Sequence, residues 1–188
     1  ASRPSYKLMQ EAKLSLTDMD IFLTDREEKF MAQWAEKIPL VGKGVRASGR
    51  AYTGFLNKLR ADTFDDVMRG ATLAGKNSPE VLLQIGRFIN TFSGRGSIGG
   101  LERAASILNG LFFSPRLMMS RLTILNPFYY VKADSLVRKE ALKSLLGIVG
   151  AGITVLTLAK MGDAKVGVDP RSSDFGKLII GNTHIDIW

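Results

Sequence analysis

Apolar residues recur every three to four positions along most of the chain, which is the spacing that places them on one face of an α-helix. Thr24 and Glu27 have the spacing of a capping box, and the apolar stripe that follows them ends at Pro39. A second, longer stripe predicts a helix over about residues 45–74. We therefore expect the first 75 residues to be largely helical.

Proline residues mark the boundaries of the helices that follow. Ser78-Pro79 and Ser114-Pro115 each predict a helix start, because serine caps free amides and proline at the first helical position loses only an unpaired N–H. Asn126-Pro127 predicts a break, because the residue before a proline is pushed out of the α region. Helices are expected over residues 79–92, 101–113 and 116–125, with a glycine-rich connector at 93–100.

The longest regular stretch runs from Ser135 to about Met161, and it is apolar on all sides from Leu145 to Ala159. The pattern then changes to alternation, and residues 177–187 predict a β-hairpin across a two-residue Gly-Asn turn. The fold class is therefore expected to be mainly α, with several helices including one long apolar helix, and a short C-terminal β-hairpin. Such a chain is expected to be extended within a larger assembly.

The pattern divides the chain into three segments: an N-terminal helical segment, a basic helical segment that ends in the long apolar helix, and a loop with the hairpin. These are residues 1–75, 76–162 and 163–188. The sequence stops at Trp188 within an alternating apolar pattern, which favours a fragment of a larger polypeptide.

The amino-acid composition excludes several kinds of catalytic and metal-binding site. The 188 residues include 26 Lys or Arg, 18 Asp or Glu, one histidine and no cysteine. A disulfide scaffold, a thiolate zinc site and a cysteine nucleophile are excluded, and His184 alone does not make a multi-histidine metal site. We expect no enzyme activity and no cofactor. The net positive charge is concentrated in residues 71–160, which hold 11 Lys or Arg and four Asp or Glu.

Two patterns resemble catalytic or binding motifs and are better explained otherwise. Residues 94–99 have the G-x-G-x-x-G spacing of dinucleotide sites, but the stretch before them is helical and no acid follows at the required distance. A helix–helix connector is the better interpretation. His184 follows the Gly-Asn turn with no catalytic triad readable around it, and the nearby aspartates lack the spacing of a calcium loop.

Basic residues interleaved with aromatic ones are candidates for nucleic-acid binding, because phosphates are neutralised by cations and bases stack on aromatic rings. Solvated helix faces, or docking against acidic neighbours, are the alternatives. The candidates are Arg87, Arg95, Arg103, Arg116, Arg121, Lys132, Arg138, Lys139 and Lys143.

The uncharged run 145–159 lies between Lys143 and Lys160 and spans about 23 Å as a helix, short of a hydrocarbon core of about 30 Å. Lysines that reach toward the interfaces could close part of this gap. Burial in a large assembly and insertion into a membrane both remain open. Small residues at helical spacing would allow close helix packing. The packing or membrane candidates are Leu145, Gly147, Gly150, Ala151, Thr154 and Leu158.

A set of short motifs runs in order from Phe30 to the C-terminus, namely residues 33–42, 113–117, 126–131, 138–143, 169–177 and 185–188. Through these motifs the chain resembles the large polyvalent proteins of tailed phages and prophages. The resemblance implies a multi-module parent that continues beyond Trp188, of a kind sometimes packaged in virions and ejected with DNA. It implies no catalytic motif at these positions.

The expected function is that of a structural segment of a phage internal virion (ejection) protein, which helps move the genome into the host and forms part of an envelope-spanning conduit. Expected partners are copies of itself, portal, tail or ejection proteins, genomic DNA and the host membrane. The expected location is the virion, inside the capsid or tail, and then the host cell envelope. The alternatives are a non-catalytic scaffold in a giant virion-packaged RNA polymerase or cell-wall hydrolase, and a portal- or capsid-bound plug.

Overall fold

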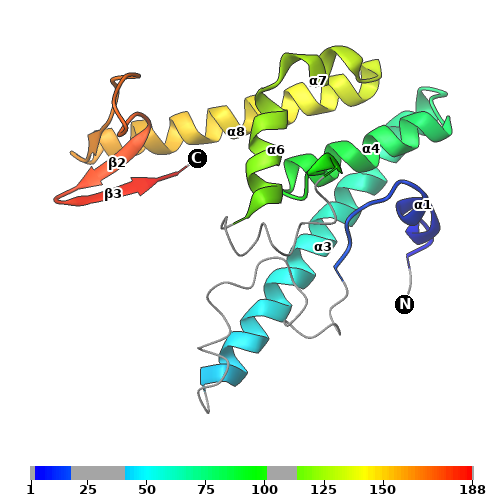
Figure 1. Ribbon diagram of the computed structural model, residues 1–188, viewed down its shortest axis with the longest axis horizontal. Helices are drawn as coiled ribbons and strands as arrows, with labels where there is room; N and C mark the ends of the chain where they lie inside the picture. The colour runs from blue at the N-terminus through cyan, green and yellow to red at the C-terminus, as the bar shows by residue number, and fades with distance from the viewer. Residues whose placement is uncertain (1–2, 18–40, 101–113, 188) are drawn as a thin grey trace. The chain divides into compact units, whose positions relative to one another are not determined.

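A computed structural model describes residues 3–17, 41–100 and 114–187, with the side chains of 41–43, 45 and 46 left out. The capping box at Thr24, the predicted helix 101–113 and Arg103 lie outside the described residues. The described chain is mainly helical, with one long apolar helix and a small C-terminal antiparallel sheet, so the expected fold class is confirmed (Figure 1). Its place in a larger assembly stays a prediction.

The chain divides into two compact units, residues 1–141 and 142–188. The core of the first unit lies where α3 (Val41–Leu73) packs against α4 (Pro79–Phe92), with α1 (Tyr6–Glu11) against α4. The buried apolar side chains of this core are Met9, Ala12, Leu14, Ala61, Phe64, Val67, Ala71, Val81, Ile85, Phe88, Ile89, Val137 and Ala141. On α3 and α4 they recur at the helical spacing that the sequence predicts.

Polar side chains of α3 hold the N-terminal segment in place. Arg60 is buried on α3; its Nε donates to Oγ of Ser93 at 2.8 Å, and Nη1 donates to the carbonyl of Ser15 at 3.3 Å. Asn57 accepts from the amide of Thr17 and donates to its carbonyl. These long-range bonds fix residues 15–17 against α3.

The proline-led helix starts are confirmed in the described residues. The hydroxyl of Ser78 accepts from the amide of Val81 at the start of α4, and Ser114 does the same at the start of α6 (Pro115–Leu125). Asn126 ends α6 as predicted, but its side chain also caps a further helix, α7 (Pro127–Lys132). This short helix was not predicted from the sequence.

The second unit contains most of α8 (Ser135–Met161) and a three-stranded antiparallel sheet, in the order β1 (Lys165–Val166), β2 (Lys177–Ile180), β3 (Thr183–Asp186). The predicted hairpin is confirmed, with Ile180 paired to Thr183 and Gly181 at a φ of 59° in the turn between them. The β1 strand was missed, since two residues are too few to show alternation.

Candidate functional site

A cavity of about 810 Å³ lies in the first unit, within the range of ligand-sized pockets. The N-terminal segment, α4, the connector after it, α6, α7 and the first turn of α8 contribute to its wall. The lining residues are Lys13, Ser15, Glu80, Gln84, Arg87, Asn90, Thr91, Arg95, Ser97, Arg116, Thr123, Tyr129, Lys132, Ala133 and Val137.

The wall of this cavity carries a strong excess of positive charge. Five of its side chains are cations, namely Lys13, Arg87, Arg95, Arg116 and Lys132, whereas Glu80 is the one acid among the described lining residues. The side chains of Lys13, Arg87 and Lys132 are exposed and form no ion pair or hydrogen bond with any other residue in the described ranges. Such an unbalanced, concave arrangement attracts anions.

Asn90 positions Lys13 at the cavity. Its Oδ1 accepts from the amide of Ser15 at 2.8 Å, and its Nδ2 donates to the carbonyl of Lys13 at 2.9 Å. Lys13 has a φ of 54°, which turns the chain back from α1. Sequence reasoning missed both residues; the one available signal was an asparagine inside a helix, where its side chain usually competes with the helix.

Tyr129 adds an aromatic surface to the same wall. Its ring lies edge-on to that of Tyr130, with centroids 5.2 Å apart. Burial, followed by the neighbouring Tyr130, raises the pKa of Tyr129 to about 12, while a hydrogen bond with Thr91 acts in the opposite direction. The phenol is therefore uncharged at neutral pH and leaves the positive charge of the cavity undiminished.

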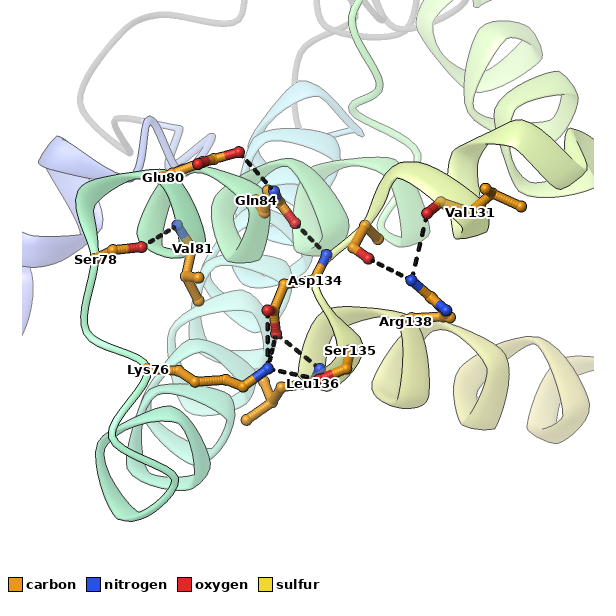
Figure 2. Close-up of polar contacts among 11 residues, drawn as sticks. Lys76, Ser78, Glu80, Val81, Gln84, Val131, Asp134, Ser135, Leu136 and Arg138 are labelled. Carbon is orange, nitrogen blue, oxygen red and sulfur yellow. Dashed lines mark hydrogen bonds and ion pairs between the residues drawn. The ribbon is translucent and has the colours of Figure 1, made fainter.

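A polar clamp fixes the corner between α7 and α8, and Figure 2 shows its residues converging. The amide of Asp134 donates to Oε1 of Gln84 at 2.7 Å, and the Asp134 carboxylate accepts from Lys76 and from the amide of Leu136. The hydrogen bond from Lys76, and then that from the Leu136 amide, lower the pKa of Asp134. The clamp thereby holds Lys132 and Val137 beside α4.

The predicted nucleic-acid residues separate into groups. Arg87, Arg95, Arg116 and Lys132 converge on the cavity, although they come from three helices and a connector. Arg138 donates to the carbonyls of Val131 and Ala133, so its guanidinium caps the C-terminal end of α7 (Figure 2). The remaining described candidates are exposed and do not line the cavity, and these are Arg121, Lys139 and Lys143.

The predicted apolar segment of α8 is helical and almost entirely exposed. In the described part of the chain, α8 is the one helix long and apolar enough to cross a membrane, and 6% of its most apolar window is buried. A Cβ added at Gly147 or Gly150 would meet no atom within 4 Å. Of the other packing or membrane candidates, Ala151, Thr154 and Leu158 are exposed, and Leu145 is half-buried.

The two hydroxyls within residues 145–159 are satisfied inside the helix itself. Thr154 donates to the carbonyl of Gly150 and Thr157 to that of Ile153, each at 2.8 Å. A polar group left unpaired in hydrocarbon costs several kcal/mol, so these bonds make the segment compatible with lipid.

The remaining candidate chemistry has a structural role. Residues 94–99 form the connector after α4, where Gly94 has a φ of 77° and the amide of Gly96 donates to Oγ of Ser120. His184 Nδ1, on β3, lies 2.9 Å from a carboxylate oxygen of Asp174 in the turn before β2. Within the described ranges, no group of three His, Asp or Glu side chains could hold a metal ion.

Comparison of the chain with protein-family models, curated proteins and solved structures found no match. The cavity and α8 are therefore interpreted from their own chemistry.

Proposed function

We propose that the chain is a structural segment of a phage internal virion (ejection) protein, which leaves the particle with the genome and enters the host envelope through α8. It acts by packing with copies of itself and with portal, tail or other ejection proteins, and it performs no bond-making step. It resides in the capsid or tail before infection and in the envelope afterwards. The motifs that resemble large polyvalent phage proteins supply this setting.

The exposure of α8 is the observation that carries the proposal. The core helix of a soluble protein would be mostly buried, whereas 6% of the apolar window of α8 is buried. The uncharged part of α8, residues 145–159, extends about 23 Å, so it needs help from its ends to cross a hydrocarbon core of about 30 Å. Lys143 and Lys160 border the uncharged part and could reach the two interfaces.

Binding to lipid vesicles tests the membrane step. The 188-residue chain is mixed with vesicles of phosphatidylcholine and phosphatidylglycerol, and the floating fraction is measured after centrifugation. An arginine at the centre of a membrane helix costs about 2.5–3.5 kcal/mol, so Ile153→Arg should weaken insertion about a hundredfold. Leu73→Arg is the matched control, since Leu73 is 85% exposed at the end of α3 and outside α8. Equal flotation of Ile153→Arg and the control would contradict insertion through α8.

The amount of the chain in phage particles, before and after DNA release, tests whether it is an ejected virion protein. The chain should be present in purified virions and depleted from particles that have released their DNA. Equal abundance in full and emptied particles would exclude ejection and would favour a plug that stays at the portal or capsid.

A further inference from the structure

We propose that the cavity of the first unit binds the headgroup of an anionic phospholipid, an inference that rests on the proposed function because it names the lipid that the chain meets in the host envelope. Five of the described lining residues are cations and one is an acid. Three of these cations, Lys13, Arg87 and Lys132, are exposed, so a ligand can reach them from outside. Basic pockets of this kind bind the phosphates of anionic headgroups.

The cavity lies close to the membrane candidate along the chain. Lys132 of α7 and Val137 in the first turn of α8 line its wall, and Asp134 between them is bonded to Gln84 of α4. The uncharged run of α8 begins shortly afterwards, at residue 145. Cations that closely precede a membrane helix in the chain are well placed to bind anionic lipid, whose phosphates lie at the membrane surface.

The polar groups of the cavity favour a ligand that is recognised by its charge. Both polar ends of the Asn90 side chain are bonded to residues 13 and 15. Gln84 likewise accepts from the amide of Asp134 and donates to Glu80. Because these amides are engaged in internal bonds, the cations are the main groups that the wall offers to a ligand. A cavity of about 810 Å³ is also far larger than an isolated phosphate requires.

Exposed apolar side chains on the helices that line the cavity favour a lipid over a water-soluble anion. Thr123 of α6 and Tyr129 of α7 line the wall together with Lys132. The same two helices carry four large apolar side chains that are 60–74% exposed, namely Leu122, Leu125, Phe128 and Val131. A soluble phosphate would leave these side chains in water, whereas the acyl chains of a lipid could cover them.

Partition of the 188-residue chain between water and vesicles tests the cavity. One set of vesicles is pure phosphatidylcholine, and the other is the same lipid mixed with phosphatidylglycerol. The ratio of the two partition coefficients is the preference for anionic lipid, because insertion through α8 contributes to both. The cavity variant combines Arg87→Gln with Lys132→Gln. The matched control combines Lys7→Gln with Arg50→Gln, two cations that are exposed on α1 and α3 and do not line the cavity.

We expect the cavity variant to lose about thirtyfold of the preference for anionic lipid. The control should lose less than about threefold, because salt screens exposed charges that do not contact the lipid. Both variants should enter pure phosphatidylcholine vesicles as the unaltered chain does. Circular dichroism melts should be unchanged for both, because the four side chains form no hydrogen bond or ion pair with other described residues.

Soluble competitors distinguish a lipid headgroup from other sources of phosphate. Inorganic phosphate, glycerophosphoglycerol (the free headgroup of phosphatidylglycerol) and an oligothymidylate are each added in excess over the lipid phosphate, at constant ionic strength. None of them should reduce the preference to that of the cavity variant, because each lacks the acyl chains that cover the exposed apolar side chains of α6 and α7.

Four results would overturn the inference. Equal losses of preference in the cavity variant and the control would show diffuse attraction by net charge. Loss of the preference on addition of inorganic phosphate or glycerophosphoglycerol would assign the cavity to a soluble anion, and loss with oligothymidylate alone would assign it to nucleic acid. A chain that enters phosphatidylcholine vesicles through α8 without any preference for phosphatidylglycerol would refute this inference while leaving the proposed function in place.

The proposed function fails by a different result. If Ile153→Arg does not weaken partition into either kind of vesicle, insertion through α8 is contradicted. A preference for phosphatidylglycerol that the cavity variant still removes would then support the cavity assignment alone.

Discussion

The ammonium nitrogen of Lys76 lies 2.7 Å from one carboxylate oxygen of Asp134, 58 positions later in the chain. Lys76 lies in the loop between α3 and α4, and Asp134 lies directly before α8, so their ion pair joins that loop to the start of α8 (Figure 2). The same carboxylate accepts from the amide of Leu136 and so caps α8. One side chain therefore both caps α8 and holds its first turn against the loop before α4, within the first unit.

Acid should weaken this attachment. The pKa of Asp134 is lowered in the folded chain, so the unfolded chain binds the proton first as the pH falls. The contribution of Asp134 is therefore complete above about pH 4 and disappears as the pH falls through the lowered folded pKa. Thermal melts recorded between neutral pH and about pH 2 measure this loss.

Substitution at Asp134 should reproduce the loss at neutral pH. Asp134→Ala removes the cap and the ion pair, and it should cost about 1–2 kcal/mol of unfolding free energy. Asp66→Ala is the control, because the Asp66 carboxylate lies 3.4 Å from Arg69 in an exposed ion pair, which contributes little to the free energy of unfolding. Equal melting temperatures for Asp134→Ala and Asp66→Ala would show that the clamp does not stabilise the fold.

Gly86 on α4 lies against Ala12, the residue that ends α1. A Cβ at this position would overlap the backbone carbonyl of Ala12, so Gly86→Ala should separate α1 from α4 and lower stability by about 1–3 kcal/mol. Gly70→Ala, within α3 and with no atom within 4 Å of the added carbon, should be neutral or stabilise by up to about 1 kcal/mol. Urea unfolding of both variants measures the difference, and a Gly86→Ala chain as stable as Gly70→Ala would place α1 elsewhere.

Particular residues show which parts of the structure could be predicted from the sequence. The proline-led starts at Ser78 and Ser114 depend on neighbouring residues, so local sequence was enough to predict the helices after them. The contacts of Asn90 with residues 13 and 15 cross 75 or more positions, and no local pattern encodes them. For the same reason four cavity arginines and lysines were recognised as basic candidates, but their convergence and the contribution of Lys13 were not.

Tyr129 should titrate late in alkali. Burial raises its pKa from 10.0 to about 12, so the folded chain keeps its phenolic proton after the unfolded chain has lost it. Stability contributed by this group is complete below about pH 10 and is lost as the pH rises through the folded pKa. Burial also raises the pKa of Tyr130, so the test is specific to the group with a midpoint near 12: ultraviolet absorbance of phenolate against pH should show this group, and Tyr129→Phe should remove it whereas Tyr6→Phe retains it. Persistence of that group in Tyr129→Phe would contradict the assignment.

A substitution at Gly150 should change the association of the chain with other copies without lowering the stability of the single chain. No atom lies within 4 Å of a Cβ built at this position, so Gly150→Leu should leave the melting temperature of the isolated chain unchanged or raise it. If helices approach through the small residues of α8, the added side chain should weaken self-association in detergent about tenfold. Val155→Leu is the control, since it lies about 140° around the helix. Sedimentation measures the self-association of both variants in detergent. Equal association of Gly150→Leu and Val155→Leu would mean that copies of α8 do not pack through Gly150.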